Sequence, residues 1–482
     1  MQVAMLIAGK SVDAAAGGTF ERRNPVTGTV VTTAAAGRLV DAQRAAEAAA
    51  DAFPAWSALG PGQRRALLMN AVETLEGRGE DFTAAMAAEI GATASWASFN
   101  VKLATDMLRE AAAMTTQIRG EIIPSDKPDC LAMGVRRPVG AVLGIAPWNA
   151  PVILGIRALA MPLACGNTVV LKASEICPRT HSLIGQAFLD AGLPAGAVNV
   201  VTNAPADAAE VVGALIAHPA IRRINFTGST GVGRQIAEHA ARALKPVLLE
   251  LGGKAPLVVL DDADLEAAAA ATSFGAFMNQ GQICMSTERV IVDEAVADRF
   301  VAILAGRARR LRATDPSRGD SVIGAMVGDE AAQRVCELVA DAVEKGAVLA
   351  AGGGRDGVLV DAAVLDRVTA QMRIYGEESF GPVVAVTRVR GEEECLRVAN
   401  DTEYGLSSAV FSRNIGRALR IAQRLDTGIC HINGPTVHDE AQMPFGGVKA
   451  SGYGRFGGQA AVREFTDLRW ITIENGAQQY PI

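Results

Sequence analysis

The sequence predicts an α/β protein with parallel sheets, and two observations support this fold class. Short apolar segments alternate with longer helical segments from about residue 138 onward. Proline and glycine punctuate the helical segments, as at Pro178 and Gly192, where they suit the first turn of a helix and the residue just past its end. Such alternation is typical of right-handed βαβ units, which place their strands side by side in a parallel sheet.

The alternation divides the chain into two sets of elements. The first set has strands at 139–145, 168–171, 198–201, 221–226 and 247–249, and helices at 152–164, 178–192, 207–217 and 230–243. The second set has strands at 257–260, 290–292, 383–387 and 408–411, and helices that include 265–277 and 330–345. We therefore expect two α/β domains, as the length of 482 residues also suggests.

The remaining segments predict helices that cover the first sheet and a separate β-arm. The segments 39–52, 63–76 and 82–114 look helical. Residues 118–136 and 465–473 alternate like strands but have no helical partners. We interpret these two segments as a projecting arm that pairs between subunits.

The composition excludes several classes of function. The net charge of -6 and the lack of a basic tract argue against a nucleic-acid partner. The seven cysteines form no C-x-x-C pair and the histidines form no cluster, which indicates neither a disulfide framework nor a metal site. Dispersed cysteines suit the reducing cytoplasm, where we expect the protein, and the N-terminus shows no export signal.

One uncharged stretch, 138–156, is nearly as long as a membrane-spanning helix. Pro147 and Pro151 interrupt it and would leave backbone groups unpaired in lipid. We interpret the stretch as a buried strand, a loop and the start of a helix, and we expect no membrane partner.

Cys284 and Glu250 are the strongest candidates for catalytic residues. Cys284 ends the segment 280–284 (QGQIC), and Glu250 begins the segment 250–254 (ELGGK). A cysteine thiolate attacks carbonyl carbons readily, and a separate carboxylate suits the later activation of water. A lone cysteine among apolar residues is more often a small buried side chain, so the pair needs support from other motifs.

Two further segments suit a dinucleotide. Residues 228–233 (GSTGVG) follow a strand and open a helix, where backbone N–H groups hold phosphate. Their spacing is not G-x-G-x-x-G, and a tight glycine turn is the alternative. Glu175 ends the segment 172–175 (KASE), where a carboxylate accepts hydrogen bonds from a ribose and repels a 2′-phosphate, which favours NAD over NADP. The alternative for Glu175 is an acidic residue near a helix start.

Asn149 and the segment 377–382 (EESFGP) complete the candidates. Asn149 follows the first strand of the first set, at the end where open α/β sheets bind ligands, and its side-chain amide suits an oxyanion. An Asx-type turn before Pro151 explains Asn149 equally well. Glu378 offers a carboxylate and Phe380 an aromatic face, which suit a second ribose and a nicotinamide; an acidic surface turn is the alternative.

Six motifs, in one order, resemble those of the aldehyde dehydrogenase superfamily over about 20–473. They are 147–149 (PWN), 226–230 (FTGST), 250–254 (ELGGK), 281–284 (GQIC), 378–382 (ESFGP) and 444–449 (PFGGVK). The resemblance implies a Rossmann-like NAD-binding domain (1–117 and 138–250), a catalytic α/β domain (251–440) and a small β oligomerisation arm (118–137 and 465–482). It further implies that 441–464 return to the domain interface and that the protein forms a homodimer or a homotetramer.

The resemblance also implies a role for each matching residue. Cys284 matches the nucleophile that forms a thiohemiacetal, Glu250 the base that activates water, and Asn149 the oxyanion donor, joined by the Cys284 backbone N–H. The positions that match contacts to NAD are Ile145, Ala146, Pro147, Trp148, Lys172, Ser174, Glu175, Gly228, Ser229, Val232, Leu251, Gly252, Glu378 and Phe380. The chain departs from the family at Phe456, which replaces an acidic residue, so an ion pair made there by relatives is not expected.

Within the superfamily, residues 140–151, 157–180 and 438–447 look most like the salicylaldehyde and vanillin dehydrogenase group. This implies oxidation of a benzaldehyde-type substrate to its carboxylic acid through a cysteine thioester. Trp96, Met285 and Phe445 match apolar positions that line the substrate tunnel in relatives. Arg157 is expected to face either a phenol oxygen of the substrate or the partner of a structural ion pair.

Four alternatives stay open from the residues alone. In the first alternative, the protein is an aldehyde dehydrogenase whose substrate is an aliphatic aldehyde or a semialdehyde. A CoA-acylating relative has less need of Glu250. A cysteine acyl hydrolase needs a histidine base, and none of the five histidines stands in a context that marks one. A non-catalytic nucleotide-binding oligomer has no reason to keep Cys284 together with Glu250.

Overall fold

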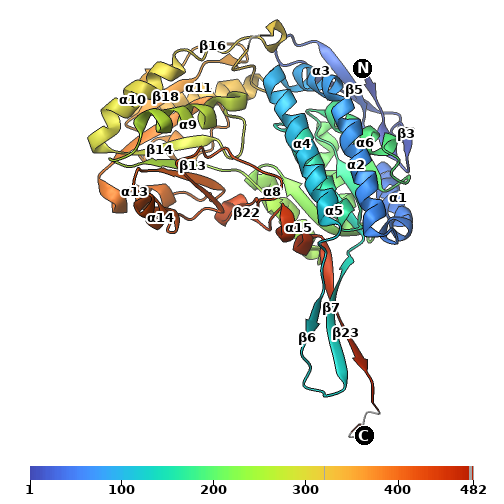
Figure 1. Ribbon diagram of the computed structural model, residues 1–482. Coiled ribbons are helices and arrows are strands. Elements are labelled where there is room, and N and C mark those ends of the chain that lie inside the picture. The colour runs from blue at the N-terminus through green and yellow to red at the C-terminus, as the bar shows by residue number, and fades with distance from the viewer. Residues whose placement is uncertain (320, 477–479, 481) are drawn as a thin grey trace.

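The computed structural model describes residues 1–319, 321–476, 480 and 482, and it contains two mixed sheets with helices packed on them. Figure 1 shows the two parts side by side, with a thin β-arm that extends away from both. The α/β fold class predicted from the sequence is therefore confirmed. The residue limits of the two predicted domains stay a prediction.

The first sheet has parallel central strands and antiparallel edges. Its order is β22 (Gly452–Tyr453), β12 (Val247–Glu250), β11 (Ile221–Thr227), β8 (Ala141–Ile145), β9 (Thr168–Lys172), β10 (Val198–Val201), β2 (Met5–Ile7) and β3 (Lys10–Val12). The strands from β12 to β10 are parallel, as the sequence predicts. Strands β2 and β3 at one end of the sheet and β22 at the other are antiparallel to their neighbours, and each is too short for a periodic pattern to reveal it.

Helices cover both faces of the first sheet. They are α1 (Leu39–Ser57), α2 (Pro61–Gly77), α3 (Gly79–Ile90), α4 (Ala94–Met114), α5 (Pro151–Ala164), α6 (Pro178–Asp190), α7 (Ala208–Ala217) and α8 (Thr230–Arg242). Alternate residues of a strand belong to different faces: Val142 packs in the apolar cluster of α5, and Leu143 in that of α1. Two covered faces explain why the strands read as continuous apolar runs.

The helical stretch predicted over 82–114 is interrupted at Gly91. This residue ends α3 with φ 66°, a left-handed backbone that favours glycine. Thr93 then caps α4, because its Oγ1 accepts a hydrogen bond from the Trp96 N–H at 3.3 Å. The break places Trp96 in the first turn of α4, beside the loop that carries Asn149.

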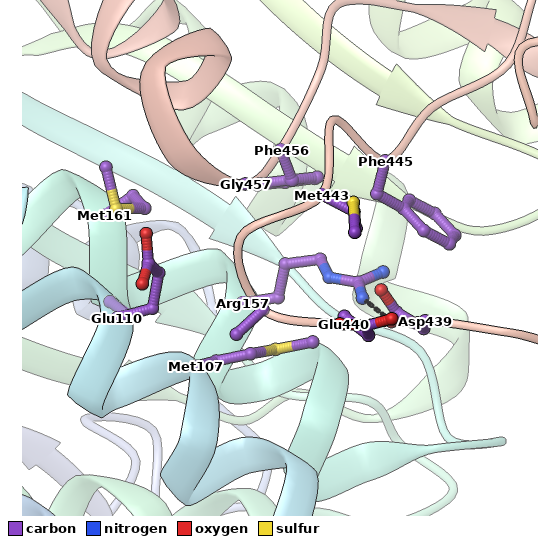
Figure 2. A pocket seen from close by; sticks show the side chains of 12 residues that line it. Met107, Glu110, Arg157, Met161, Asp439, Glu440, Met443, Phe445, Phe456 and Gly457 are labelled. Atoms are coloured by element: carbon purple, nitrogen blue, oxygen red, sulfur yellow. Dashed lines mark hydrogen bonds and ion pairs between the residues drawn. The ribbon is translucent and has the colours of Figure 1, made fainter.

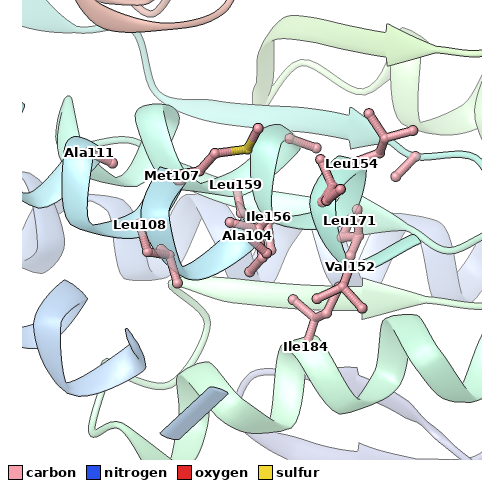
Figure 3. Close-up of a cluster of buried hydrophobic side chains, with 14 of the residues drawn as sticks. Ala104, Met107, Leu108, Ala111, Val152, Leu154, Ile156, Leu159, Leu171 and Ile184 are labelled. Carbon is pink, nitrogen blue, oxygen red and sulfur yellow. The ribbon is translucent and has the colours of Figure 1, made fainter. Parts of the chain in front are cut away.

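The contact between α4 and α5 forms the centre of the main apolar core. Every residue of α5 is buried. Figure 3 shows Ala104 and Leu108 of α4 with Ile156 and Leu159 of α5 in one cluster. Burial of each leucine- or isoleucine-sized side chain contributes about 1.5–3 kcal/mol. This packing fixes the start of α5 and, with it, the preceding loop.

The second sheet repeats the pattern. Its order is β15 (Val348–Ala351), β18 (Ala363–Asp366), β19 (Val383–Val389), β14 (Thr287–Asp293), β13 (Ala255–Val259), β20 (Ser407–Phe411) and β21 (Ile429–Ile432). Its helices are α9 (Leu265–Phe277), α10 (Glu294–Ala308), α11 (Asp329–Glu344), α13 (Gly391–Asn400) and α14 (Ile415–Ala422). The predicted strands are confirmed, and only β15 pairs antiparallel within the described part of this sheet.

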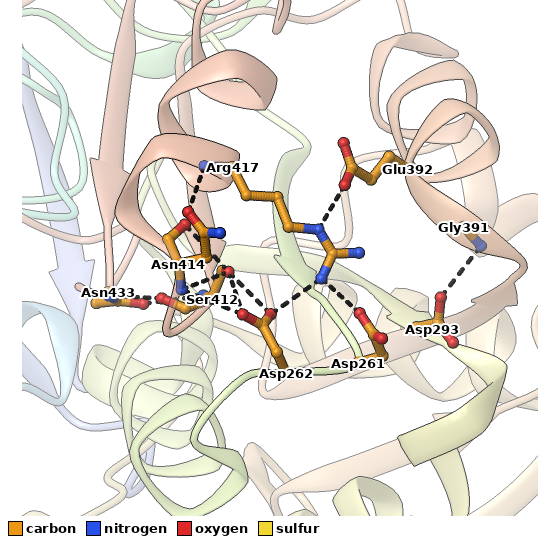
Figure 4. Close-up of polar contacts among 9 residues, drawn as sticks. All are labelled: Asp261, Asp262, Asp293, Gly391, Glu392, Ser412, Asn414, Arg417 and Asn433. Carbon is orange, nitrogen blue, oxygen red and sulfur yellow. Dashed lines mark hydrogen bonds and ion pairs between the residues drawn. The ribbon is translucent and has the colours of Figure 1, made fainter.

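A polar network lies just beyond the C-terminal end of β13. Arg417 donates hydrogen bonds to Asp261 at 2.6 Å and to Glu392, as Figure 4 shows. Asp262 accepts from Ser412 Oγ at 2.8 Å. Asp261 and Asp262 come just after β13, whereas Lys254, in the segment that begins with Glu250, comes just before it. The network therefore lies at the other end of the strand from Glu250.

The arm joins segments that are distant in the chain. It consists of β6 (Glu121–Ile123), β7 (Cys130–Pro138) and β23 (Thr466–Glu474), with β7 antiparallel to both neighbours (Figure 1). Ile122, Leu468 and Trp470 are 72%, 54% and 75% exposed. The predicted arm segment 465–482 includes residues 477–479 and 481, which lie outside the described residues.

Short elements complete the fold. They are β1 (Gln2–Val3), β4 (Thr19–Arg23), β5 (Val30–Ala35), β16 (Arg355–Asp356), β17 (Leu359–Val360), α12 (Arg373–Gly376) and α15 (Gly458–Glu464), with 3₁₀ turns η1 (Pro205–Asp207), η2 (Met278–Gly281), η3 (Pro316–Arg318) and η4 (Lys449–Ser451). Among the described residues, none of the helices combines the length and the apolar character needed to cross a membrane. The stretch 138–156 forms β8, a loop and the first turns of α5, as predicted.

Candidate active site

The loop between β8 and α5 holds Asn149 in a fixed position. Asn149 is 6% exposed, and its backbone carbonyl accepts hydrogen bonds from Trp96 Nε1 at 3.0 Å and Asn279 Nδ2 at 3.1 Å. The Asn149 side chain donates through Nδ2 to the Gln282 carbonyl at 3.0 Å. A side-chain amide carries two hydrogens. Asn149 therefore keeps a second donor beside the loop that carries Cys284.

The turn before Cys284 has a strained backbone, and the side chain of Gln280 in that turn stabilises it through hydrogen bonds. Gln280 has φ 57°, in the left-handed region. Its side-chain amide forms hydrogen bonds with the backbone of residues 324–325, at 2.8 and 2.9 Å. A Cβ on Gly281 would lie 2.0 Å from the Gly381 carbonyl oxygen, so only glycine lets this turn approach that segment.

Cys284 follows this turn and keeps partial exposure to solvent. Burial of the thiol and then the nearby Glu250 carboxylate raise its pKa to about 12, against the opposing effect of the Arg157 guanidinium. The thiol is therefore protonated at neutral pH in this state. In the described part of the chain, the cysteine that contacts a histidine ring is Cys177, beside His181, which leaves the hydrolase alternative without a base at Cys284.

Glu250 ends β12 and lies buried near the thiol. It is 2% exposed, and neither carboxylate oxygen has a hydrogen-bond partner among the described residues. Burial raises its pKa well above the usual range, against the charges of Arg157 and Arg455. A Cβ on Gly446 would lie 2.7 Å from Glu250 Oε1, so glycine there leaves the carboxyl group room. Buried carboxyl groups without partners are destabilising and gather at functional sites.

Arg157 lies on α5 and forms a buried ion pair with Asp439, their side chains being 6% and 9% exposed. Its guanidinium carbon is 4.1 Å from the centre of the Phe445 ring and 5.9 Å from that of Phe456. Figure 2 shows the ion pair beside these rings. The structure thus contains the ion pair, one of the two interpretations predicted for Arg157. A contact with substrate stays a prediction.

The other predicted substrate residues gather around the same place. Trp96, Met285 and Phe445 are 4%, 6% and 4% exposed and belong to one apolar cluster, against which Cys284 packs. The Trp96 ring also stacks on Phe99, with ring centres 5.6 Å apart. The surroundings of the thiol are therefore apolar on this side.

A cavity of about 430 Å³ opens where β8, β9 and β11 end, the place expected for a ligand of an open α/β sheet. Apolar side chains from α7 and α8 line one side, among them Val212 and Ile236. The cavity brings together many of the predicted cofactor residues: Ile145, Ala146, Pro147, Trp148, Lys172, Ser174, Glu175, Gly228 and Val232.

The polar side of the cavity is a network centred on Glu175. Its carboxylate forms an ion pair with Lys172 and accepts from Asn203 Nδ2 at 2.8 Å. A carboxylate has about four lone-pair sites, so Glu175 retains sites for further donors. Ser229 caps α8 through the Val232 N–H at 3.4 Å, which places the positive end of the helix dipole at this end of the cavity.

Glu378 lies against the segment that follows Glu250. Its Oε1 accepts from the Gly253 N–H at 2.9 Å, and a Cβ on Gly252 would lie 2.7 Å from its Oε2. Glycine at position 252 therefore admits the carboxylate. Burial, followed by the nearby Glu288 carboxylate, raises the pKa of Glu378 to about 7.

Phe380 connects this region with the cavity, because its ring meets Trp148 edge-on with ring centres 5.8 Å apart. The donors and acceptors fit a dinucleotide. An apolar slot suits the base, the Glu175 carboxylate a ribose, the α8 N-terminus a pyrophosphate, and Glu378 a second ribose.

Some features of the site were not predicted. Glu288 forms an ion pair with Lys254 at 2.5 Å, the two side chains being 4% and 0% exposed. Its signal in the sequence is a charged residue next to an apolar strand segment. Asp439 pairs with a residue 282 positions away, so no local pattern announces it.

Comparisons with known proteins agree with this geometry. Residues 12–471 match the aldehyde dehydrogenase family. The chain is 62% identical to the vanillin dehydrogenase of Pseudomonas fluorescens and 51% identical to the salicylaldehyde dehydrogenase of Pseudomonas putida, and each match covers 100% of both chains. The crystal structure of a salicylaldehyde dehydrogenase from Pseudomonas putida G7 complexed with salicylaldehyde has a TM-score of 0.98, 50% sequence identity and 100% coverage of both chains.

The chain therefore belongs to the aldehyde dehydrogenase family and is an aldehyde dehydrogenase. Members of this family use NAD or NADP. The resemblance inferred from six motifs is confirmed, and so is the fold that it implies.

Proposed function

We propose that the protein catalyses the NAD-dependent oxidation of an aromatic aldehyde to the carboxylic acid. The observation that carries the proposal is that Cys284, Asn149 and Glu250, whose carboxylate has no hydrogen-bond partner among the described residues, lie next to a cavity of about 430 Å³ where the parallel strands end. The full-length relatives named vanillin and salicylaldehyde dehydrogenases support the aromatic substrate.

Cys284 begins the reaction. Its Sγ loses its proton to solvent, to which Cys284 is partly exposed, and attacks the aldehyde carbon, which forms a thiohemiacetal. The second Nδ2 hydrogen of Asn149 and the Cys284 N–H stabilise the oxyanion; loss of one such donor typically slows a reaction about 10²–10³-fold. When NAD is bound it supplies the hydride acceptor, and loss of the hydride leaves a thioester on Cys284.

Glu250 acts in the second half of the reaction, the hydrolysis of the thioester. Its carboxylate takes a proton from water as the water oxygen adds to the thioester carbonyl, and the carboxylic acid and the free thiol are released. A raised pKa makes Glu250 a stronger base than an exposed glutamate. Because its oxygens have no partner among the described residues, both are available to water.

The cofactor residues divide into three groups. Lys172, Ser174 and Glu175 are assigned to the adenosine ribose, Ser229 to the pyrophosphate, and Glu378 and Phe380 to the nicotinamide end. The surrounding contacts are assigned to Ile145, Ala146, Pro147, Trp148, Gly228, Val232, Leu251 and Gly252. Glu175 favours NAD, because a 2′-phosphate would meet a like charge there.

The substrate pocket is assigned to Trp96, Met285 and Phe445. Aromatic pairs contribute about 0.5–1.5 kcal/mol beyond the burial of their area, which favours a benzene ring over an alkyl chain. Arg157 has five N–H donors, and its ion pair with Asp439 leaves others for a phenol oxygen.

The arm is assigned to the contact between subunits of a homodimer or homotetramer. Its exposed Ile122, Leu468 and Trp470 form apolar surface on a narrow sheet, which is typical of strands that pair with another chain. Light scattering of Trp470→Glu should show a smaller particle than the unmodified protein. The seven unpaired cysteines suit the reducing cytoplasm.

A panel of aldehydes tests the proposal. Formation of NADH is measured with vanillin, salicylaldehyde, benzaldehyde, an aliphatic aldehyde and succinic semialdehyde, and the aldehydes are ranked by kcat/KM. We expect the aromatic aldehydes to rank first and the acid to form without CoA. A higher kcat/KM for an aliphatic aldehyde or the semialdehyde would contradict the aromatic assignment.

A further inference from the structure

We propose that Glu288 is a positioning residue for the cofactor loop, defined as residues 378–380, and that its carboxylate fixes where Glu378 and Phe380 meet the nicotinamide end of the cofactor. The inference rests on the proposed cofactor assignment and deepens it. It adds a residue to which no motif in the sequence gives a role.

Four donors surround the buried carboxylate of Glu288. Lys254 Nζ donates to Oε2 at 2.5 Å, and Ser379 Oγ donates to the same oxygen at 2.8 Å. The Ser379 N–H reaches both oxygens at 3.0 Å, and the Phe380 N–H reaches Oε1 at 3.0 Å. Three of the four donors belong to the cofactor loop, so Glu288 binds the loop directly.

The conformation of the cofactor loop needs such an anchor. Phe380 has φ 49°, a left-handed backbone that is strained for a bulky side chain and persists only where its surroundings enforce it. Successive backbone N–H groups in a turn of this kind form a concave anion site. The Glu288 carboxylate fills that site and thereby holds the Phe380 ring against Trp148.

The ion pair between Glu288 and Lys254 also connects the cofactor loop to the segments that carry Cys284 and Glu250. Glu288 is four residues after Cys284, and Lys254 is four residues after Glu250. The strands β14 and β13, which begin here, are parallel neighbours. A Cβ on Gly253 would lie 2.3 Å from the Cys284 carbonyl oxygen, so the two segments touch. One buried ion pair therefore fixes the nucleophile, the base and the cofactor loop relative to one another.

The charge of Glu288 also acts on Glu378. Burial and then Glu288 raise the pKa of Glu378, while Lys254 and Arg334 lower it, and Tyr404 lies close as well. Glu378 accepts hydrogen bonds from ribose hydroxyls best when ionised. Replacement of Glu288 by a neutral residue therefore shifts the ionisation of Glu378 to lower pH.

Calorimetric binding of NAD and AMP to the purified full-length protein tests the proposal. AMP lacks the nicotinamide half of NAD and therefore does not reach the cofactor loop. In Glu288→Gln we expect NAD affinity to fall about tenfold or more, as for the loss of charged hydrogen bonds, and AMP affinity to stay within about twofold. The pH at which NAD binding is half-maximal should also move lower in this variant.

Two further variants make the test specific. Glu89 is a matched control, because it is a buried carboxylate that accepts from the Arg179 and Thr180 N–H groups at 2.8 and 3.0 Å. Glu89→Gln should lower the melting temperature and leave the ratio of NAD to AMP affinity unchanged. Should Glu288→Gln fail to fold, the double variant Lys254→Met, Glu288→Met carries the test, because it leaves no unpaired buried charge.

The outcomes separate this inference from the proposed function. Unmodified protein that binds no NAD would contradict the proposed function, and the inference with it. Unmodified protein that binds NAD, with Glu288 variants that bind NAD equally well or lose NAD and AMP affinity equally, would overturn the inference alone. A selective loss of NAD affinity that Glu89→Gln does not show supports it.

Discussion

The cavity assigned to the cofactor lies next to the reactive pocket, which we define as the surroundings of Cys284, Glu250 and Asn149. The polar side chains of the two regions differ in how many hydrogen-bond partners they have. In the cavity, Glu175 is held by Lys172 and Asn203. In the reactive pocket, neither oxygen of Glu250 has a hydrogen-bond partner among the described residues, and the pKa values of both Glu250 and Cys284 are raised.

The difference agrees with the role that we propose for each region. A binding group is most useful when its neighbours fix it in the conformation that the ligand needs, because less entropy is then lost on binding. A nucleophile or a base must instead form new bonds, so partners that satisfied it permanently would weaken it. Unsatisfied groups of this kind are typical of functional sites, where local stability is lower than elsewhere in the fold.

The largest expected effect comes from removal of the thiol. Cys284→Ala should abolish NADH formation, because the covalent intermediate cannot form, while the cavity still binds NAD. Steady-state rates and calorimetric NAD binding check both halves of this expectation. Cys336→Ala on α11 is the control and should keep full activity. Substantial turnover by Cys284→Ala would show that the reactive pocket is assigned wrongly.

The second effect concerns Glu250, the proposed base, whose carboxylate oxygens have no hydrogen-bond partner among the described residues. Glu250→Gln should release a single burst of NADH and then turn over slowly, because the thioester forms but is hydrolysed poorly. Loss of a general base typically costs about 10²–10⁴-fold, on the order of 3–5 kcal/mol in the barrier. Rapid-mixing kinetics measure the burst. A full steady-state rate without a burst would exclude this role for Glu250.

The third effect concerns pH. The pKa of Cys284 is raised to about 12, so its thiolate fraction rises about tenfold with each pH unit up to that value. Alkylation of Cys284 by iodoacetamide in the absence of cofactor should therefore increase about 100-fold from pH 7 to pH 9, without a plateau. Cys284→Ala supplies the background from the other cysteines. A plateau below pH 9 would show that the thiol is not held in its neutral form.

The residues proposed to bind the cofactor are easier to name from the sequence than the surroundings of Glu250. Strand ends and a helix start indicate a candidate phosphate and ribose site by local spacing, so Lys172, Glu175 and Ser229 can be proposed from short segments. The surroundings of Glu250 depend on Gly446, almost two hundred residues later in the chain. No local pattern predicts such a contact, although the motif containing Glu250 identifies the residue itself.

Secondary-structure elements and ion pairs can likewise be predicted only where the residues that determine them are close in the sequence. Helix α9 was predicted with its observed bounds, and the signal at its start is local, because the Asp264 side chain caps it by accepting from the Ala267 N–H. Strands β2, β3 and β22 are too short to carry a period, and their pairing depends on distant strands. The pair formed by Lys254 and Glu288 depends on the register of two parallel strands, which the sequence does not reveal.

The fourth prediction concerns the substrate side of the reactive pocket, where Asp439 holds Arg157 beside Phe445. Arg157→Met combined with Asp439→Asn avoids an unpaired buried carboxylate. If Arg157 contacts a phenol oxygen, kcat/KM should fall about 10–150-fold for hydroxybenzaldehydes, the equivalent of about 1.5–3 kcal/mol, and little for benzaldehyde. Equal losses for both substrates would identify Arg157 as a structural residue, and aromatic preference would then depend on Trp96, Met285 and Phe445.

The smallest expected effect lies in the cofactor cavity. Glu175→Gln should narrow the preference for NAD over NADP by about tenfold or less, because Lys172 and Asn203 already offset part of the charge that a 2′-phosphate would meet. The ratio of kcat/KM for the two cofactors measures this. Glu210→Gln, at a half-exposed carboxylate on α7, is the control for a general change in charge. Unmodified protein that uses NADP better than NAD would show that a paired carboxylate does not exclude the phosphate, and that this cavity is less fixed than its contacts indicate.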